Sequence, residues 1–104
     1  QERGTCFEVG DAFYRAESAL SRDLAVLAGA LRRRRRGGEL RVFDAMSGCG
    51  VRALRYLNEA GADFVRANDA SQAHSRLRAH NLRTYASPAR HDTARATSGR
   101  RRES

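Results

Sequence analysis

The sequence predicts an α/β fold in which parallel strands alternate with helices, and three observations support this class. A short apolar run ends in Asp44, and a loop of small residues containing Gly48 and Gly50 follows it. The next apolar run also ends in an acid, Asp69. Each run leads into a stretch with helical spacing of apolar residues. Strand, loop and helix in this order hold nucleotide-like ligands at the carboxyl edge of a parallel sheet.

The loop at residues 44–53 predicts a ligand site. Its glycines permit a tight turn and a close approach of the backbone to a ligand, because no Cβ intervenes. The spacing Gly48-x-Gly50-x-x-Ala53 fits the relaxed dinucleotide fingerprint. However, several residues separate the apolar run from the first glycine, and Asp44 would repel a pyrophosphate. The pattern instead resembles motif I of S-adenosylmethionine-dependent methyltransferases, whose ligand is cationic.

Asp69 strengthens the prediction of a nucleoside ligand. It follows the glycine loop at about the offset of 20 residues at which an acid meets ribose hydroxyls in βαβ units. The carboxylate of Asp44 can likewise accept hydrogen bonds from amines or hydroxyls. These residues alone leave open a glycine turn in an unrelated α/β protein, with Asp69 as a helix cap.

Composition favours a polyanionic partner. The 104 residues carry a formal net charge of +8, and all 20 basic residues are arginine. Arginine binds phosphate through two parallel hydrogen bonds, although the absence of lysine also indicates coding bias in a GC-rich genome. Five consecutive arginines suit either RNA phosphates or the C-terminus of a helix; they are Arg32, Arg33, Arg34, Arg35 and Arg36.

Several classes of site are not indicated. Cys6 and Cys49 match neither a zinc spacing nor a disulfide scaffold, so no metal is expected. No apolar run approaches the roughly 18 residues needed to cross a membrane, so no membrane partner is expected. Nothing at the start reads as a secretory signal. An intracellular place, the nucleus or an organelle (plastid or mitochondrion), is expected, and the oligomeric state stays open.

The remaining segments complete a single expected domain, residues 1–86. Residues 5–9 suggest a short strand, and residues 18–35 a helix with one leucine stripe expected to contact the sheet. Residues 87–104 are small, polar and rich in arginine without periodicity, which predicts a disordered tail. The leucines of the stripe are Leu20, Leu24, Leu27 and Leu31.

Arg52 lies in the first turn of the helix after the glycine loop, where a cation is unfavourable with the helix dipole. A ligand carboxylate bound there would neutralise it, so its position hints at function. Arg22, by contrast, is interpreted from its helical position alone as a solvent-exposed charge.

Four segments together carry a family pattern. Residues 13–14 followed by 21–24 (Ser-Arg-Asp-Leu) are similar to an "F-Y-x…N-R-D" segment, with serine in place of the usual asparagine. Residues 44–56 are similar to the motif "D-A-x-[SC]-[AG]-x-G-[IV]-R-x-[IL]-R-[FY]". Residues 67–69 match its "x-N-D" acid, and Asn81 matches the asparagine that closes the next helix. On these motifs the chain resembles the tRNA (guanine-26) N2-dimethyltransferase family.

This resemblance implies a Rossmann-like class I methyltransferase fold, of which the chain carries the N-terminal part, with about two parallel core strands and flanking helices. It implies S-adenosylmethionine as cofactor, tRNA as partner, and transfer of one or two methyl groups to guanine N2 at position 26. By motif position, Arg22 and Arg52 would hold the methionine carboxylate or neighbouring groups, and Asp69 the ribose hydroxyls. The implied cofactor-binding residues are Arg22, Asp44, Gly48, Gly50, Arg52 and Asp69.

One family motif is missing. The catalytic "Asp-Pro-(Phe/Tyr)-Gly" segment has no counterpart, because the chain contains no Asp-Pro pair. No catalytic residue is therefore assigned, and the chain alone is expected to be inactive. The residues leave open an arginine-rich RNA-binding fragment without catalysis, a NAD-type dinucleotide-binding domain, and a methyltransferase of another substrate class.

Overall fold

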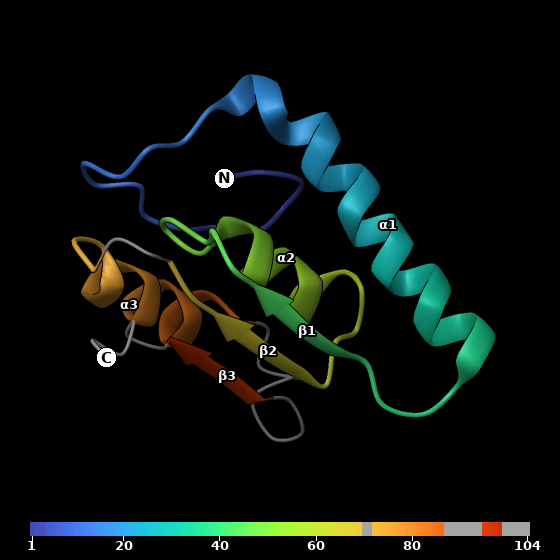
Figure 1. Cartoon of the computed structure of the whole chain (residues 1–104). Helices are drawn as coiled ribbons and strands as arrows, with labels where there is room; N and C mark the ends of the chain where they lie inside the picture. Colours follow the sequence, from blue (N-terminus) through green and yellow to red (C-terminus); the bar gives the residue numbers. More distant parts are fainter. Residues whose placement is uncertain (70–71, 87–94, 99–104) are drawn as a thin grey trace.

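The structure is a computed structural model that describes residues 1–69, 72–86 and 95–98. The chain forms a parallel sheet that is covered by helices. Its three strands follow one another across the sheet in chain order (Figure 1): β1 (Arg41–Asp44), β2 (Phe64–Ala67) and β3 (Arg95–Ser98). The register pairs Asp44 with Ala67. The carboxyl ends of β1 and β2 therefore meet at one edge, where the glycine loop and Asp69 were expected.

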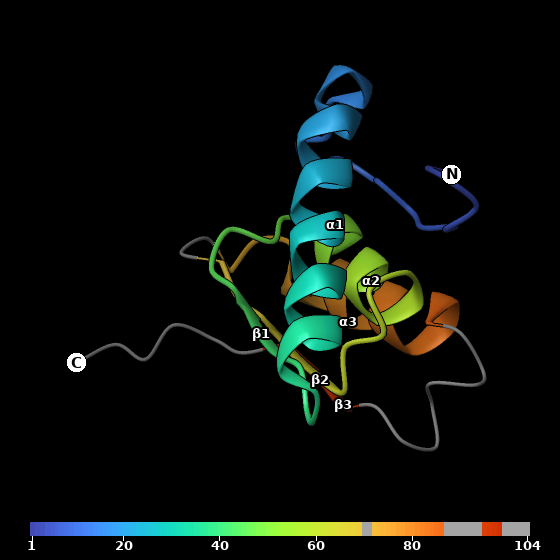
Figure 2. The same ribbon diagram turned by 90° about the vertical axis from the view of Figure 1, so that its right-hand side faces the viewer.

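The helices lie on one side of this sheet. α2 (Val51–Asn58) connects β1 to β2, and α3 (Ser75–Tyr85) lies between β2 and β3 along the chain. Both pack on the strands, whereas α1 (Ala19–Arg36), which follows the short helix η1 (Ala16–Ser18), packs on α2 (Figure 2). The predicted class, parallel strands alternating with helices, is confirmed.

The main core forms between α2 and the sheet. Leu54 and Leu57 of α2, three residues apart and so on one side of the helix, are 0% and 2% exposed. They meet Val65 and Ala67 of β2, which are both fully buried. Alternation along β2 leaves Arg66 exposed on the other face of the sheet. This packing fixes the start of α2, and with it the glycine loop.

The leucine stripe of α1 is largely exposed instead of buried against the sheet, which corrects the sequence-based expectation. Leu20, Leu24, Leu27 and Leu31 are 66%, 61%, 55% and 43% exposed. Instead, α1 packs on the core through Val26, which is 7% exposed and belongs to the same cluster as Leu54 and Leu57, and it approaches α2 closely at Gly29. A Cβ added at Gly29 would lie 3.6 Å from both Tyr56 and Ala60. Periodicity identifies the residues that share one side of a helix, but contact with α2 decides which side is buried.

Two further expectations fail at the ends of the chain. Residues 5–9 form no strand; an isolated antiparallel bridge joins Glu2 and Thr5. Within residues 87–104, expected to be a disordered tail, residues 95–98 form β3, which adds a third strand to the two that were expected. The strand Arg-Ala-Thr-Ser carries no apolar signal, and main-chain pairing with β2 defines it. The rest of this stretch lies outside the described residues.

No helix in the described ranges is long and apolar enough to cross a membrane. Although α1 reaches 18 residues, it ends in five arginines.

Candidate cofactor site

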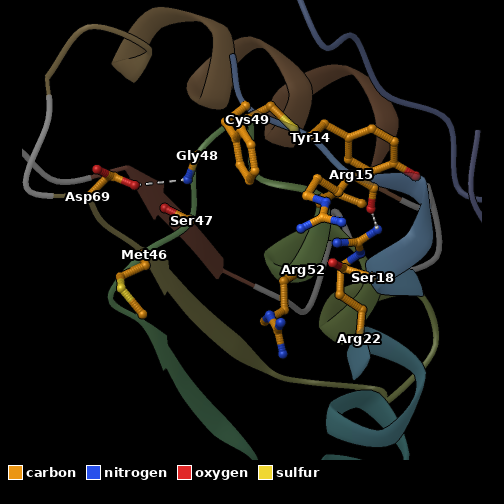
Figure 3. A pocket seen from close by; sticks show the side chains of 12 residues that line it. Tyr14, Arg15, Ser18, Arg22, Met46, Ser47, Gly48, Cys49, Arg52 and Asp69 are labelled. Carbon is orange, nitrogen blue, oxygen red and sulfur yellow. Dashed lines mark hydrogen bonds between the residues drawn. The ribbon is translucent and has the colours of Figure 1, made fainter. Parts of the chain in front are cut away.

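A pocket of about 300 Å³ lies beside the glycine loop, at the carboxyl ends of β1 and β2 (Figure 3). This volume is at the lower end of the range of about 300–1,000 Å³ that is usual for small-molecule sites. Phe13 and Tyr14 form one wall, ahead of α1. Four of the six residues predicted to bind a cofactor also line it: Arg22, Gly48, Arg52 and Asp69.

Hydrogen bonds tie the glycine loop to the end of β2. The Ser47 amide and hydroxyl both donate to the Asn68 carbonyl, at 2.9 and 2.6 Å. The Gly48 amide donates to Asp69 Oδ2 at 3.1 Å, as Figure 3 shows. Gly48 has φ of +53°, a conformation that favours glycine. The structure therefore brings the loop and the second acid together, as the sequence predicts.

Asp44 lies beneath the loop and does not line the pocket. Its side chain is mostly buried, and Oδ2 accepts no hydrogen bond from any described residue. Burial raises the pKa of Asp44, while the nearby positive charges of Arg52 and Arg78 lower it. A buried acceptor without a hydrogen-bond donor costs free energy. A ligand group that donates a hydrogen bond to this oxygen would remove that cost.

Gly50 shapes the loop from below instead of lining the pocket. It caps the N-terminus of α2 with φ of +95°. A Cβ at this position would come within 3.3 Å of Arg78 Cγ. The glycine is therefore needed for the turn and for the close packing of α3 under the loop.

The guanidinium of Arg52 is available to a ligand. Arg52 lines the pocket from the first turn of α2. It forms no ion pair with another residue in the described part of the chain. Its predicted place beside the loop is confirmed; its predicted contact with a carboxylate stays a prediction.

Arg22 lines the same pocket but already holds a carboxylate. Its Nε and Nη2 donate to Glu2 at 2.9 and 2.6 Å, and Nη2 also donates to the Arg15 carbonyl at 2.8 Å. The guanidinium lies 4.9 Å from the centre of the Tyr14 ring. A ligand carboxylate therefore reaches Arg22 only at Nη1 or by displacing Glu2. Nothing in the sequence pattern around Glu2 indicated this pairing.

Glu2 belongs to a buried ionic cluster that joins the N-terminus to α1 and α2. Arg55 donates to Glu2 at 3.0 Å and to Glu59 at 2.6 Å, and it pairs with Asp23 at 2.7 Å. The side chains of Glu2 and Arg55 are each only 3% exposed. Arg55 and Glu59 are four residues apart on α2, but their pair is part of this buried cluster and not a surface pair.

The cluster holds the Glu2 carboxylate in its charged form. The hydrogen bond from Arg22 is the main cause, and bonds from Tyr14 and Arg55 add to it, while burial opposes them. Together they lower the pKa of Glu2 to about 2. The Tyr14 hydroxyl donates to Glu2 at 2.7 Å. The cluster thus fixes the aromatic wall of the pocket as well as Arg22.

The five arginines predicted to contact RNA lie away from the pocket. Residues 32–36 are exposed and form the last turns of α1. They begin ten residues beyond Arg22, or about 15 Å along the helix at 1.5 Å per residue. Arg33 lies 3.8 Å from Asp63. In the described ranges, no group of three or more His, Cys, Asp or Glu is placed to hold a metal ion.

A glycine loop after β1, an acid after β2 and a pocket between them are arranged as in the N-terminal part of a Rossmann-like methyltransferase fold. The ribosomal protein L11 methylase of Lactobacillus delbrueckii subsp. bulgaricus shares this fold. Its structure aligns with a TM-score of 0.56 and 20% identity, over 89% of this chain and 42% of that chain.

The family model described as N2,N2-dimethylguanosine tRNA methyltransferase matches residues 2–96, and the chain belongs to this family. A curated relative, the tRNA (guanine(26)-N(2))-dimethyltransferase of Methanothermobacter thermautotrophicus (strain Delta H), is 43% identical over 58 residues. The match covers 55% of this chain and 15% of the relative. The family predicted from the motifs is confirmed.

Proposed function

We propose that this chain binds S-adenosylmethionine in the pocket beside the glycine loop, as part of an enzyme that methylates guanine N2 in tRNA. The observation that carries the proposal is the convergence of three groups on one pocket: Gly48, Asp69 and Arg52. Membership of the N2,N2-dimethylguanosine family supports the substrate.

The residues of the site fit the polar groups of this cofactor. Arg52 would bind the methionine carboxylate, and Asp69 the ribose hydroxyls. The buried Oδ2 of Asp44, which accepts no hydrogen bond from a described residue, would accept one through a water molecule that also binds the cofactor's amine, because Asp44 itself does not line the pocket. Gly48 allows close approach of the ligand to the backbone. When bound, the cofactor supplies an activated methyl group on its sulfonium.

We expect the 104-residue chain to bind the cofactor without transferring the methyl group, because it contains no Asp-Pro pair. Incubation with labelled S-adenosylmethionine and unmodified tRNA tests this expectation. Label that appears at guanine N2 with this chain alone would contradict it.

Ligand specificity can be tested by thermal unfolding with S-adenosylhomocysteine or NADH. A ligand that binds the folded state raises the melting temperature with its concentration. We expect S-adenosylhomocysteine to do so and NADH at the same concentration to have no effect. Stabilisation by NADH alone would instead identify a dinucleotide-binding domain.

A second candidate function is RNA binding without catalysis, which the exposed arginines at residues 32–36 favour. Filter binding of tRNA should then weaken steeply with salt and fall when these arginines are replaced by glutamine. Asp69→Ala should leave this binding unchanged, because Asp69 lies at the pocket and not beside the arginine cluster. Equal tRNA binding by the glutamine variant would exclude the cluster as the contact.

A further inference from the structure

Two buried side chains of α3, Arg78 and Asn81, hold the glycine loop from below. They are 1% and 0% exposed, and they lie three residues apart, on one side of the helix. Arg78 Nη1 donates to the Gly48 carbonyl at 3.0 Å, and Asn81 Nδ2 donates to the Cys49 carbonyl at 2.8 Å. The carbonyls of two consecutive loop residues are thus both bound by one helix.

Asn81 binds the N-terminal segment with the same amide group. Its Oδ1 accepts from the Glu8 amide at 2.8 Å, and Nδ2 donates to the Glu8 carbonyl at 2.7 Å. This segment continues to Phe13 and Tyr14, which form the aromatic wall of the pocket. One side chain therefore links the loop to the segment that leads to the aromatic wall.

The bonds restrict the orientation of two peptide planes. A peptide unit is planar, so fixing a carbonyl fixes the direction of the whole unit. The carbonyls of Gly48 and Cys49 face α3, and Gly48 itself lines the pocket. Gly50 lets Arg78 approach this closely, because a Cβ there would lie 3.3 Å from Arg78 Cγ. The shape that the loop presents to a ligand thus depends on α3.

Arg78 also places a positive charge near two carboxylates of the site. Burial lowers the pKa of Arg78, and the negative charges of Asp69 and Asp44 oppose that change. Asp44 also feels the charge of Arg52 from α2. The charge of this buried cation favours the ionised form of Asp44, whereas burial and the charge of Asp69 oppose it.

We propose that Arg78 and Asn81 are positioning residues of the cofactor site: both fix carbonyls of the glycine loop, and Asn81 also binds the N-terminal segment that leads to the aromatic wall. The inference rests on the proposed cofactor function. It assigns affinity for S-adenosylmethionine to two residues that do not line the pocket.

The test compares Arg78→Met with Arg76→Met, which removes an exposed arginine from the same helix. Calorimetric titration with S-adenosylhomocysteine is made from pH 5 to pH 8, with folding checked by circular dichroism. We expect folded Arg78→Met to bind about tenfold more weakly, the effect of losing one charge-assisted hydrogen bond. We also expect its affinity to fall with decreasing pH at a higher pH than in the unmodified chain, because Asp44 loses a neighbouring cation. Arg76→Met should match the unmodified chain.

A residue that only stabilises the fold would change neither the affinity of the folded protein nor its pH profile, and that result would overturn the proposal. If Arg78→Met does not fold, Arg78→Lys and Asn81→Ser replace it. Folded Arg78→Lys should keep the pH profile and lose affinity, and Asn81→Ser should lose affinity; unchanged affinity in both would also overturn the proposal. Absence of binding by the unmodified chain would reject the proposed function itself.

Discussion

Arg22 and Arg52 line the same pocket, and the same family pattern implies a cofactor role for both, yet their surroundings differ. Arg22 donates two hydrogen bonds to the buried carboxylate of Glu2. Arg52 forms no ion pair within the described part of the chain. One arginine is thus part of the framework of the pocket wall, and the other is available to a ligand. A motif identifies residues that lie near the pocket. The ion pairs that each residue makes within the protein then show which of them can still bind a charged ligand group.

The largest expected effect is on the free energy of unfolding, through the buried ionic cluster around Glu2. Glu2→Gln leaves Arg22 and Arg55 buried without their shared carboxylate, and breaking a buried ion pair in this way costs about 3–5 kcal/mol. Urea unfolding followed by circular dichroism measures the loss, with the exposed Glu17→Gln as control. Equal midpoints for the two variants would show that the cluster does not stabilise the fold.

Acid should weaken the same cluster. The pKa of Glu2 is about 2 in the folded chain and has an ordinary value of 4.5. Its contribution to the free energy of unfolding is therefore complete above about pH 4.5 and is lost as the pH falls toward 2. The free energy of unfolding, measured in urea from pH 7 to pH 2, should fall less over this interval in Glu2→Gln than in the unmodified chain. Parallel pH profiles would contradict the assignment.

Leucines show the same contrast between a framework residue and an exposed one. Leu57 of α2 is 2% exposed, and Leu24 of α1 is 61% exposed. Leu57→Ala should lower the free energy of unfolding by about 2–5 kcal/mol, and Leu24→Ala by less than about 0.5 kcal/mol. Urea unfolding measures both. A comparable loss in Leu24→Ala would show that the stripe on α1 is covered in solution.

The smallest expected change is in ligand affinity, and it distinguishes the role of Arg52 from that of Arg22. Arg52→Met should weaken S-adenosylhomocysteine binding about tenfold, as expected for one charge-assisted contact, and leave the unfolding midpoint unchanged. Arg22→Met should lower the midpoint, while the affinity of its folded fraction changes by less than about threefold. Calorimetry and urea unfolding on both variants measure these values. The opposite ranking of affinities would make Arg22 the principal carboxylate ligand.

Local patterns in the sequence were sufficient for the centre of the fold. The strand ending in Asp44, the glycine turn and the acid Asp69 each have a short-range signal, because turn geometry and apolar periodicity depend on neighbouring residues. Their meeting at one edge follows from parallel pairing of consecutive strands. These features correctly predicted the fold class and a site beside the loop, whereas the family was predicted from the resemblance of the longer motifs.

Features that depend on distant partners were not predictable. Glu2 meets Arg55 across 53 positions, and Asn81 meets Glu8 across 73 positions. Neither pair leaves a local pattern. The sequence showed that α1 is amphipathic. It did not show that Val26 and Gly29, instead of the leucine stripe, would lie on the buried side of the helix. β3 lacks apolar alternation, so main-chain pairing alone reveals it.

Calorimetric titration of S-adenosylhomocysteine into the unmodified chain, beside Asp69→Ala and the exposed-acid control Asp11→Ala, tests the cofactor site most directly. We expect saturable binding by the unmodified chain and by Asp11→Ala. Asp69→Ala should bind at least about tenfold more weakly, because it loses a carboxylate acceptor and the bond that holds Gly48. Equal binding by all three chains, or no binding to a folded unmodified chain, would contradict the assignment of this pocket to S-adenosylmethionine.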